Sequence, residues 1–143
     1  MKVMVIFRRS SVGGAELARW LAEGFAAAGW TVEQGDLDAV MPGRLAGASP
    51  VARRQPAVEG LIDHLSQVDL VVLASDRVVF ADRGGPDLAR LAGWAGAAAV
   101  PVIAVGAQAD LSTREARGLG VEAVYAAGSA EAVPLIVATW TPR

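Results

Sequence analysis

The chain of 143 residues contains no cysteine and a single histidine, His64. Without cysteine there are no disulfides, no thiolate nucleophiles and no sulfur ligands for a metal, and the absence is typical of a cytoplasmic protein. A lone histidine is more often a surface residue than a base or a ligand. We therefore expect neither a metal site nor a Ser/His/Asp triad in this chain.

The chain also lacks an excess of basic residues. Lysine and arginine number 13 against 15 aspartates and glutamates, which gives a net charge of −2. A protein that follows nucleic acid needs cations to neutralise the phosphates. The composition therefore argues against nucleic acid as a ligand.

No uninterrupted hydrophobic run is long enough to cross a membrane. The most apolar stretch, residues 91–109, is broken by Pro101, several glycines and Gln108. The apolar run after Lys2 is too short for a signal peptide and is followed by Arg8. Aromatic residues make up only 6% of the chain although 53% of it is hydrophobic. We expect a cytoplasmic protein without membrane contact, whose surplus apolar surface favours a homo-oligomer such as a dimer.

What the sequence does contain is a regular succession of short strands. Each is rich in valine and isoleucine, and several are almost continuously apolar, as parallel strands covered on both faces are. Helical patterns of apolar residues lie between them. The predicted strands are residues 2–7, 30–34, 69–75, 101–106 and 121–126.

The predicted helices complete an alternation of strand and helix. They cover residues 15–29, 56–66 and 86–96, and a short one follows the Ser112/Glu115 capping-box spacing up to Gly120. Residues 134–140 fit a helix or a strand equally well. Alternation of this kind predicts a single α/β domain over residues 1–143, with three layers and a five-stranded, mainly parallel sheet, Rossmann-like or flavodoxin-like. Residues 42–57 are predicted to be an irregular surface connection.

In such sheets the ligand lies beyond the carboxyl ends of the strands. After the first strand come two arginines, two serines and two glycines, and then a helix begins. Free backbone N–H groups, the helix dipole and guanidinium groups together favour an anion. The alternative is that a serine caps the helix while the arginines are solvated. The candidate binding residues of this turn are Arg8, Arg9, Ser10, Ser11 and Gly13.

The turn after the third strand is the best catalytic candidate by position. Asp76 and Arg77 are the residues we expect to orient a ligand or transfer a proton, and Ser75 is a further binding candidate. The alternative is that these charges pair with each other or with neighbouring loops. The adjacent Phe80 has a ring suited to a planar ligand. Asp36 and Asp38, after the second strand, are a weaker signal because capping or solvation is their more common role.

Two stretches of the sequence resemble the bacterial type 1 glycerate kinases. VDLVVLASDR (68–77) followed by VPVIAVGAQADLSTREARGLGVEAVYAAG (100–128) is similar to the C-terminal part of that family, and the opening MKVMVIF with the later AEGF is similar to its start. The resemblance implies a transferase that phosphorylates glycerate with ATP, its site lying between an α/β domain and an inserted second domain. Arg77 matches the arginine of the family's GEGR motif.

The chain departs from that family where the chemistry is carried. Ser75 and Val79 stand where the family has Glu and Asp, Arg8 and Arg9 replace its DSFKG segment, and most of the inserted domain is missing. Phosphoryl transfer needs carboxylates for Mg²⁺ and a clamp around the phosphates. The resemblance therefore implies a glycerate-kinase-like domain that binds a small anionic molecule, with altered or lost kinase activity and with no assigned cofactor.

Two other functions fit the sequence. Chain length, the five-strand rhythm, the hydroxyl-bearing first turn and DLVVLAS (69–75) followed by Phe80 resemble flavodoxins, which transfer electrons with FMN. The first turn nevertheless lacks their Thr/Ser-x-Thr-Gly-x-Thr pattern. The third alternative is a non-enzymatic dimeric or partner-binding module.

Overall fold

A computed structural model describes residues 1–8, 11–37, 60, 62–78 and 84–142 of the chain. The connection predicted over residues 42–57 and the helix start predicted at Pro56 lie outside the described residues. Residues 62–65 are helical, as predicted for that part of the chain.

The core of the molecule is one five-stranded sheet in the order β2-β1-β3-β4-β5, and every pair of neighbouring strands is parallel. This confirms the predicted α/β class. Strands β3 and β4 run further than predicted, to Val78 and Ala109. The strands are β1 (Lys2–Phe7), β2 (Thr31–Asp36), β3 (Leu70–Val78), β4 (Val102–Ala109) and β5 (Ala123–Ala126).

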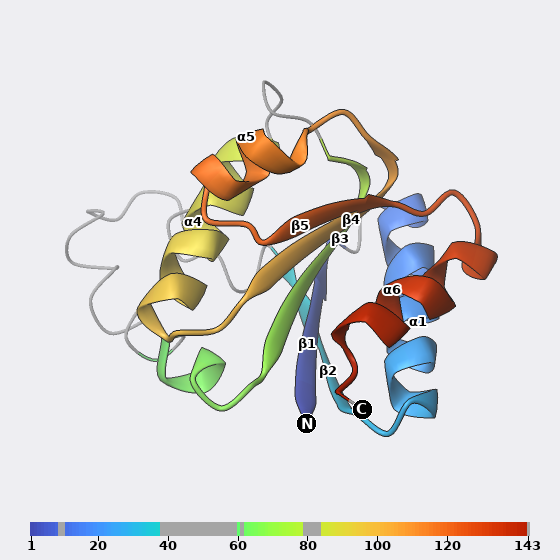
Figure 1. Cartoon of the computed structure of the whole chain (residues 1–143), viewed down its shortest axis with the longest axis horizontal. Coiled ribbons are helices and arrows are strands. Elements are labelled where there is room, and N and C mark those ends of the chain that lie inside the picture. Colours follow the sequence, from blue (N-terminus) through green and yellow to red (C-terminus); the bar gives the residue numbers. More distant parts are fainter. Residues whose placement is uncertain (9–10, 38–59, 61, 79–83, 143) are drawn as a thin grey trace.

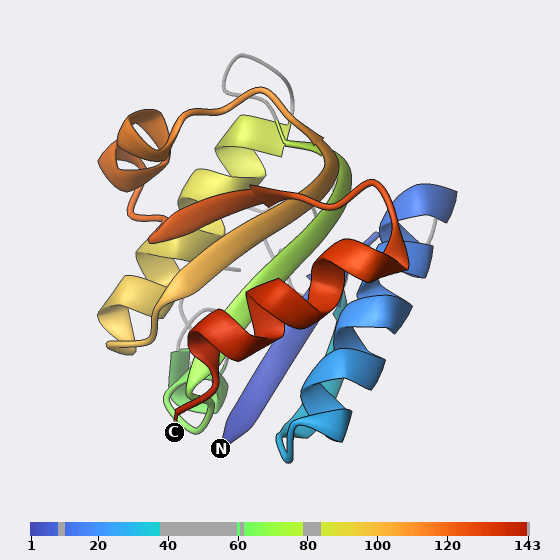
Figure 2. The same cartoon turned by 45° about the vertical axis from the view of Figure 1, so that its right-hand side comes forward.

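Helices cover both faces of the sheet (Figures 1 and 2). One face carries α1 (Val12–Ala27) and α6 (Val133–Trp140), which lie beside each other, and the other carries α4 (Gly84–Ala97) and α5 (Thr113–Gly118). The tail that fitted a helix or a strand is thus helical, and Pro134 stands in its first turn, where a proline costs no hydrogen bond. None of the helices described is long and apolar enough to cross a membrane.

Alternation along β1 explains why this strand is apolar throughout. Val3 and Val5 pack with α1 and α6, whereas Met4 and Ile6 pack with the helices of the opposite face. All four side chains are buried because each face of the sheet has its own helical layer.

The helix ends follow the chemistry of their residues. Gly29 and Gly120 end their helices with φ of 94° and 90°, the left-handed region that glycine tolerates best. The capping box predicted at Ser112 is present: its hydroxyl accepts from the Glu115 N–H, and the Glu115 carboxylate accepts from the Ser112 N–H. The carboxyl end of α1 and both ends of α5 were therefore predictable from local sequence.

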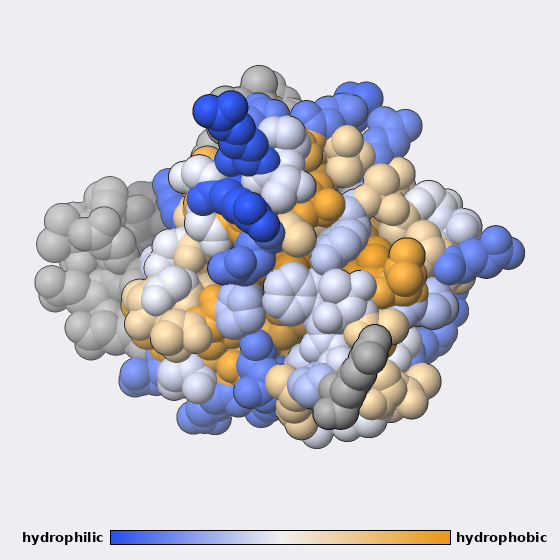
Figure 3. Space-filling model, viewed as in Figure 1, coloured by the Kyte–Doolittle hydropathy of each residue, from blue (hydrophilic) through white to orange (hydrophobic). Residues whose placement is uncertain are grey.

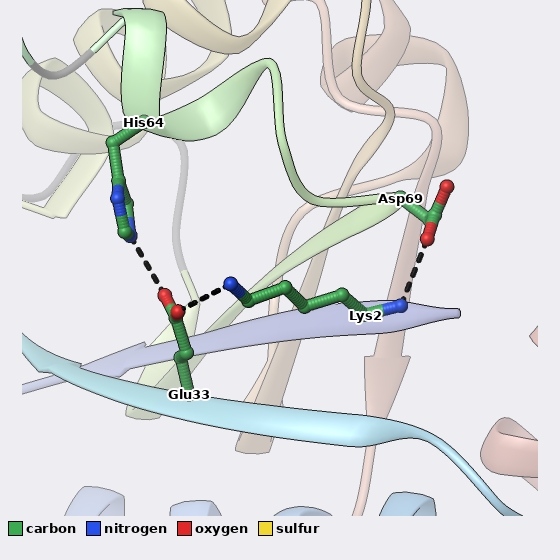
Figure 4. A network of polar contacts seen from close by, with 4 residues as sticks. All are labelled: Lys2, Glu33, His64 and Asp69. Carbon is green, nitrogen blue, oxygen red and sulfur yellow. Dashed lines mark hydrogen bonds and ion pairs between the residues drawn. The ribbon is translucent and has the colours of Figure 1, made fainter.

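A polar network ties the first strands together where β1 and β3 begin (Figure 4). Glu33 of β2 accepts from the Lys2 ammonium at 2.6 Å and pairs with the His64 ring at 2.7 Å, while Asp69 accepts from the Lys2 backbone N–H at 2.8 Å. The hydrogen bond from Lys2, and then the one from His64, hold the pKa of Glu33 below its usual range. Through its contact with Glu33, His64 thus stabilises the sheet near the edge at which β1 and β3 begin.

Candidate functional site

The candidate site lies at the carboxyl edge of the sheet, beyond the ends of β1 and β3. The chain leaves β1 toward β2 on one side, and later strands are added beyond β3 on the other. The strand order therefore reverses between β1 and β3, and the helices that follow them, α1 and α4, lie on opposite faces of the sheet. Such a switch point is where ligands bind in open parallel sheets.

Ser11, just before α1, contacts the end of β3 at this point. Its backbone is extended, and its hydroxyl caps α1 by accepting from the Gly14 N–H at 3.2 Å. The same hydroxyl donates to the Asp76 carboxylate of β3 at 2.5 Å. The candidate residues Ser11 and Asp76 thus lie close together, and a single hydroxyl bridges α1 and the end of β3.

Gly13 and Gly14 make room for this contact. A Cβ on Gly13 would lie 1.7 Å from Oδ1 of Asp76, and a Cβ on Gly14 would lie 2.8 Å from the Ser11 hydroxyl oxygen. No side chain larger than hydrogen fits at Gly13 unless Asp76 moves. Gly13 is therefore explained by the close approach of β3, and Gly14 by the capping side chain of Ser11.

Asp76 points toward α1 because of its place in the alternation of β3. Ala74, two residues before it, packs in the core beneath α1. The Asp76 carboxylate continues on that side and comes to lie at the amino end of α1, whose own first turn holds no acidic residue. A carboxylate at this place is favoured by the helix dipole.

Arg77 belongs to a second group of polar residues that includes the end of β4. It pairs in register with Gln108 and donates to the Gln108 side-chain carbonyl at 3.2 Å, and its Nε lies 3.6 Å from the Asp110 carboxylate. Arg77 and Asp110 are both well exposed, so the pair contributes little to stability. The Ser75 hydroxyl donates to the Arg77 backbone carbonyl at 3.0 Å.

The structure divides the predicted site residues into these two groups. Ser11, Gly13 and Asp76 meet at the start of α1, whereas Arg77 is directed to β4 and Ser75 donates to the Arg77 carbonyl. Asp76 and Arg77 have different partners at this edge: Asp76 accepts from Ser11, whereas Arg77 pairs with Asp110 just after β4, which agrees with the alternative that these charges pair with neighbouring loops. Their roles toward a ligand stay predictions.

The other residues singled out from the sequence add less. Arg8 is half-buried and already has an interaction, and its carbonyl accepts from the Ser11 N–H. Asp36 ends β2 and has an interaction of its own. Arg9 and Ser10, like Asp38, Val79 and Phe80, lie outside the described residues.

Gln108 and Asp110 follow the fourth predicted strand, but the sequence alone assigned them no role. They follow the apolar run VIAV of the fourth strand, so the signal was present in the same form as for Asp76. Their importance depends on the register between β3 and β4, which places Arg77 opposite Gln108. Within the described part of the chain, no group of His, Asp and Glu is arranged to hold a metal.

A hollow elsewhere on the molecule offers no comparable chemistry. It has a volume of about 650 Å³ and lies between α1 and α6, near the apolar area that Figure 3 shows in this region. Apart from Thr141 its lining is made of glycine, alanine, proline and valine, and none of these described residues titrates. The carboxyl edge is therefore the better candidate.

Solved structures match this arrangement along almost their whole length. A NAD(P)H:quinone oxidoreductase from Methanothermobacter marburgensis is similar over 95% of this chain and 94% of its own, with 14% identity and a TM-score of 0.58. The two-electron reduced flavodoxin from Megasphaera elsdenii matches over 96% and 98%, with 13% identity and a TM-score of 0.57. The chain has the flavodoxin-like fold.

A third match is a short-chain flavodoxin associated with a non-canonical PDU bacterial microcompartment. It covers 96% of this chain and 95% of its own, with 8% identity and a TM-score of 0.56. No protein-family model matches the chain, and no curated protein matches its sequence. Identities this low establish the fold alone.

The resemblance to the type 1 glycerate kinases is therefore wrong, and with it the glycerate-kinase-like transferase function. The stretches of sequence that resemble that family fall mostly on the buried strands β1, β3 and β4, and on the partly exposed β5. Any parallel α/β protein needs such apolar runs. Packing, not a shared phosphoryl-transfer site, accounts for the similarity.

Proposed function

We propose that this protein is a flavodoxin-like protein that binds a flavin at the carboxyl edge of its sheet and serves in oxidation and reduction. The observation that carries the proposal is the strand order β2-β1-β3-β4-β5, whose switch point lies beside the polar residues Ser11, Asp76 and Arg77. The likeness to flavodoxins and to a quinone oxidoreductase over nearly the full chain supports it.

The polar groups at the ends of β3 and β4 suit the ring of a flavin. Its pyrimidine part carries carbonyl and N–H groups, and Arg77, Gln108 and Asp110 offer donors and acceptors within one cluster. When bound, the flavin would supply the capacity to accept and return electrons. The chain's own residues would bind the ring and orient it.

The turn at the start of α1 does not suit the phosphate of FMN. In this fold a phosphate at that place would use the N–H groups of the turn and the dipole of α1. Here the Asp76 carboxylate lies against Gly13 and holds the Ser11 hydroxyl. The proposal is therefore a flavin in general, without a step that depends on its phosphate.

A fluorescence titration tests the proposal. Adding the purified protein to riboflavin and to FMN should quench and shift the flavin emission in a saturable way with at least one of them. Arg77→Ala should weaken this binding, whereas Arg19→Ala, on the exposed side of α1, should leave it unchanged. Absence of any saturable signal with either flavin would refute flavin binding.

The cytoplasmic location and the homodimer expected from the sequence stay predictions. Size-exclusion chromatography with light scattering over a range of concentrations tests the dimer. A monomer at all concentrations would contradict it.

A further inference from the structure

We propose that the Asp76 carboxylate takes the place of a ligand phosphate at the start of α1, so that this edge of the sheet selects the unphosphorylated form of its ligand. For a flavin, this means riboflavin in preference to FMN. The inference rests on the proposed function for the identity of the ring, but its central point concerns any phosphate.

The first argument is space. The start of a helix preceded by glycines binds a phosphate because the backbone can approach the anion closely. Beside Gly13 that space is filled, since a Cβ there would lie 1.7 Å from Oδ1 of Asp76. The space beside Gly13 that a ligand phosphate would need is therefore occupied by the Asp76 side chain.

The second argument is hydrogen bonding. The Ser11 hydroxyl accepts a hydrogen bond from the Gly14 N–H and donates one to the Asp76 carboxylate. A hydroxyl has one proton to donate, so it has none left for a phosphate oxygen. A phosphate would have to displace the carboxylate to gain this donor.

The third argument is charge. The amino end of a helix carries about half a positive charge, which one carboxylate already balances. A phosphate monoester brings a further charge of about −2 next to that carboxylate. Arg8 has an interaction already, and Arg77 is engaged with Gln108 and Asp110. A phosphate at this place would therefore be repelled by the Asp76 carboxylate.

The experiment is an amide NMR titration with inorganic phosphate, which does not depend on any flavin. In the native protein the Gly13 and Gly14 amide signals should not show a saturable shift. In Asp76→Asn, which removes the charge, and in Asp76→Ala, which removes charge and volume, both signals should shift and saturate. Well-dispersed spectra verify that each variant is folded.

Asp69→Asn is the matched control, because it removes the same charge at the opposite edge, where Asp69 accepts from the Lys2 N–H. Its response to phosphate should equal that of the native protein. Saturable phosphate binding at Gly13 and Gly14 of the native protein would overturn the inference. So would failure of both Asp76 variants to gain phosphate binding.

A second arm measures flavin selection. The native protein should bind riboflavin more tightly than FMN, and Asp76→Asn should raise the affinity for FMN relative to riboflavin by about tenfold or more. An unchanged ratio would contradict the inference. If neither flavin binds, the proposed function fails, while the phosphate titration still decides the role of Asp76.

Discussion

Gly13 is the residue at which the contact between α1 and β3 leaves no room for a side chain. Gly13→Ala should destabilise the protein by about 1–2 kcal/mol, because the new methyl group must push Asp76 away from Ser11. Urea unfolding measures this change. In an Asp76→Ala background the same substitution should cost much less, since the group it collides with is gone.

Gly93→Ala, in the middle of α4, is the matched control. A Cβ there would have no neighbour within 4 Å, so this substitution should stabilise the protein by about 0.5–1 kcal/mol through helix propensity alone. If Gly13→Ala were equally stabilising, the close approach of Asp76 to the turn would be contradicted.

Glu33 makes a pH-dependent contribution at the other edge of the sheet. Its pKa is lowered in the folded state by Lys2 and His64, so its stabilising effect is complete above the unfolded-state pKa of about 4.5 and is lost as the pH falls through the lower folded-state value. Glu33→Gln should therefore cost about 1 kcal/mol or less near neutral pH and almost nothing in strong acid.

Chemical unfolding of both proteins at several pH values checks this. Glu23→Gln is the control, because Glu23 is 66% exposed and pairs with Arg19 at 3.6 Å. It should change stability little at any pH. A cost of Glu33→Gln that stays constant down to strong acid would contradict the ion-pair account.

Local sequence predicted some of these residues better than others. The Ser112/Glu115 capping box and the φ-positive Gly29 are decided within a few residues of chain, and both were predicted correctly. The contact between Ser11 and Asp76 joins residues 65 positions apart. Position after a strand marked Asp76 as a candidate, but only the assembled sheet tells which turn it faces.

At the scale of elements, α5 depends on its cap. The helix is only six residues long, too short to be stable alone. Ser112→Ala removes one half of the capping box and should destabilise the protein by about 1 kcal/mol. Thr113→Ala, one residue further and equally exposed, should have a much smaller effect in the same unfolding measurement; equal effects would argue against the cap.

The C-terminal segment shows what local patterns leave open. Residues 134–140 contain both a proline and β-branched residues, and these predict different structures. Packing decides in favour of a helix: Val133 and Val137, one turn apart, both face Gly24 of α1, where a Cβ would lie 3.0 and 3.1 Å from them. Such a contact between distant helices has no signature within the segment itself.

At the scale of the whole molecule, alternation of strands and helices was enough to predict a parallel sheet with helices on both faces. The strand order was not contained in that pattern, because any right-handed succession of βαβ units satisfies it. The same apolar runs led to the wrong family, since buried strands of unrelated α/β proteins look alike. Function follows from which turns the strand order brings together.

The central claim is that a ligand binds at the carboxyl edge of the sheet, where the start of α1 lies beside the ends of β3 and β4. Amide NMR of the native protein during a riboflavin titration tests it most directly. We predict saturable shifts at Gly13, Gly14, Arg77 and Asp110, with Lys2, Glu33 and Asp69 unaffected. Shifts confined to the opposite edge, or no shifts at all, would contradict the account.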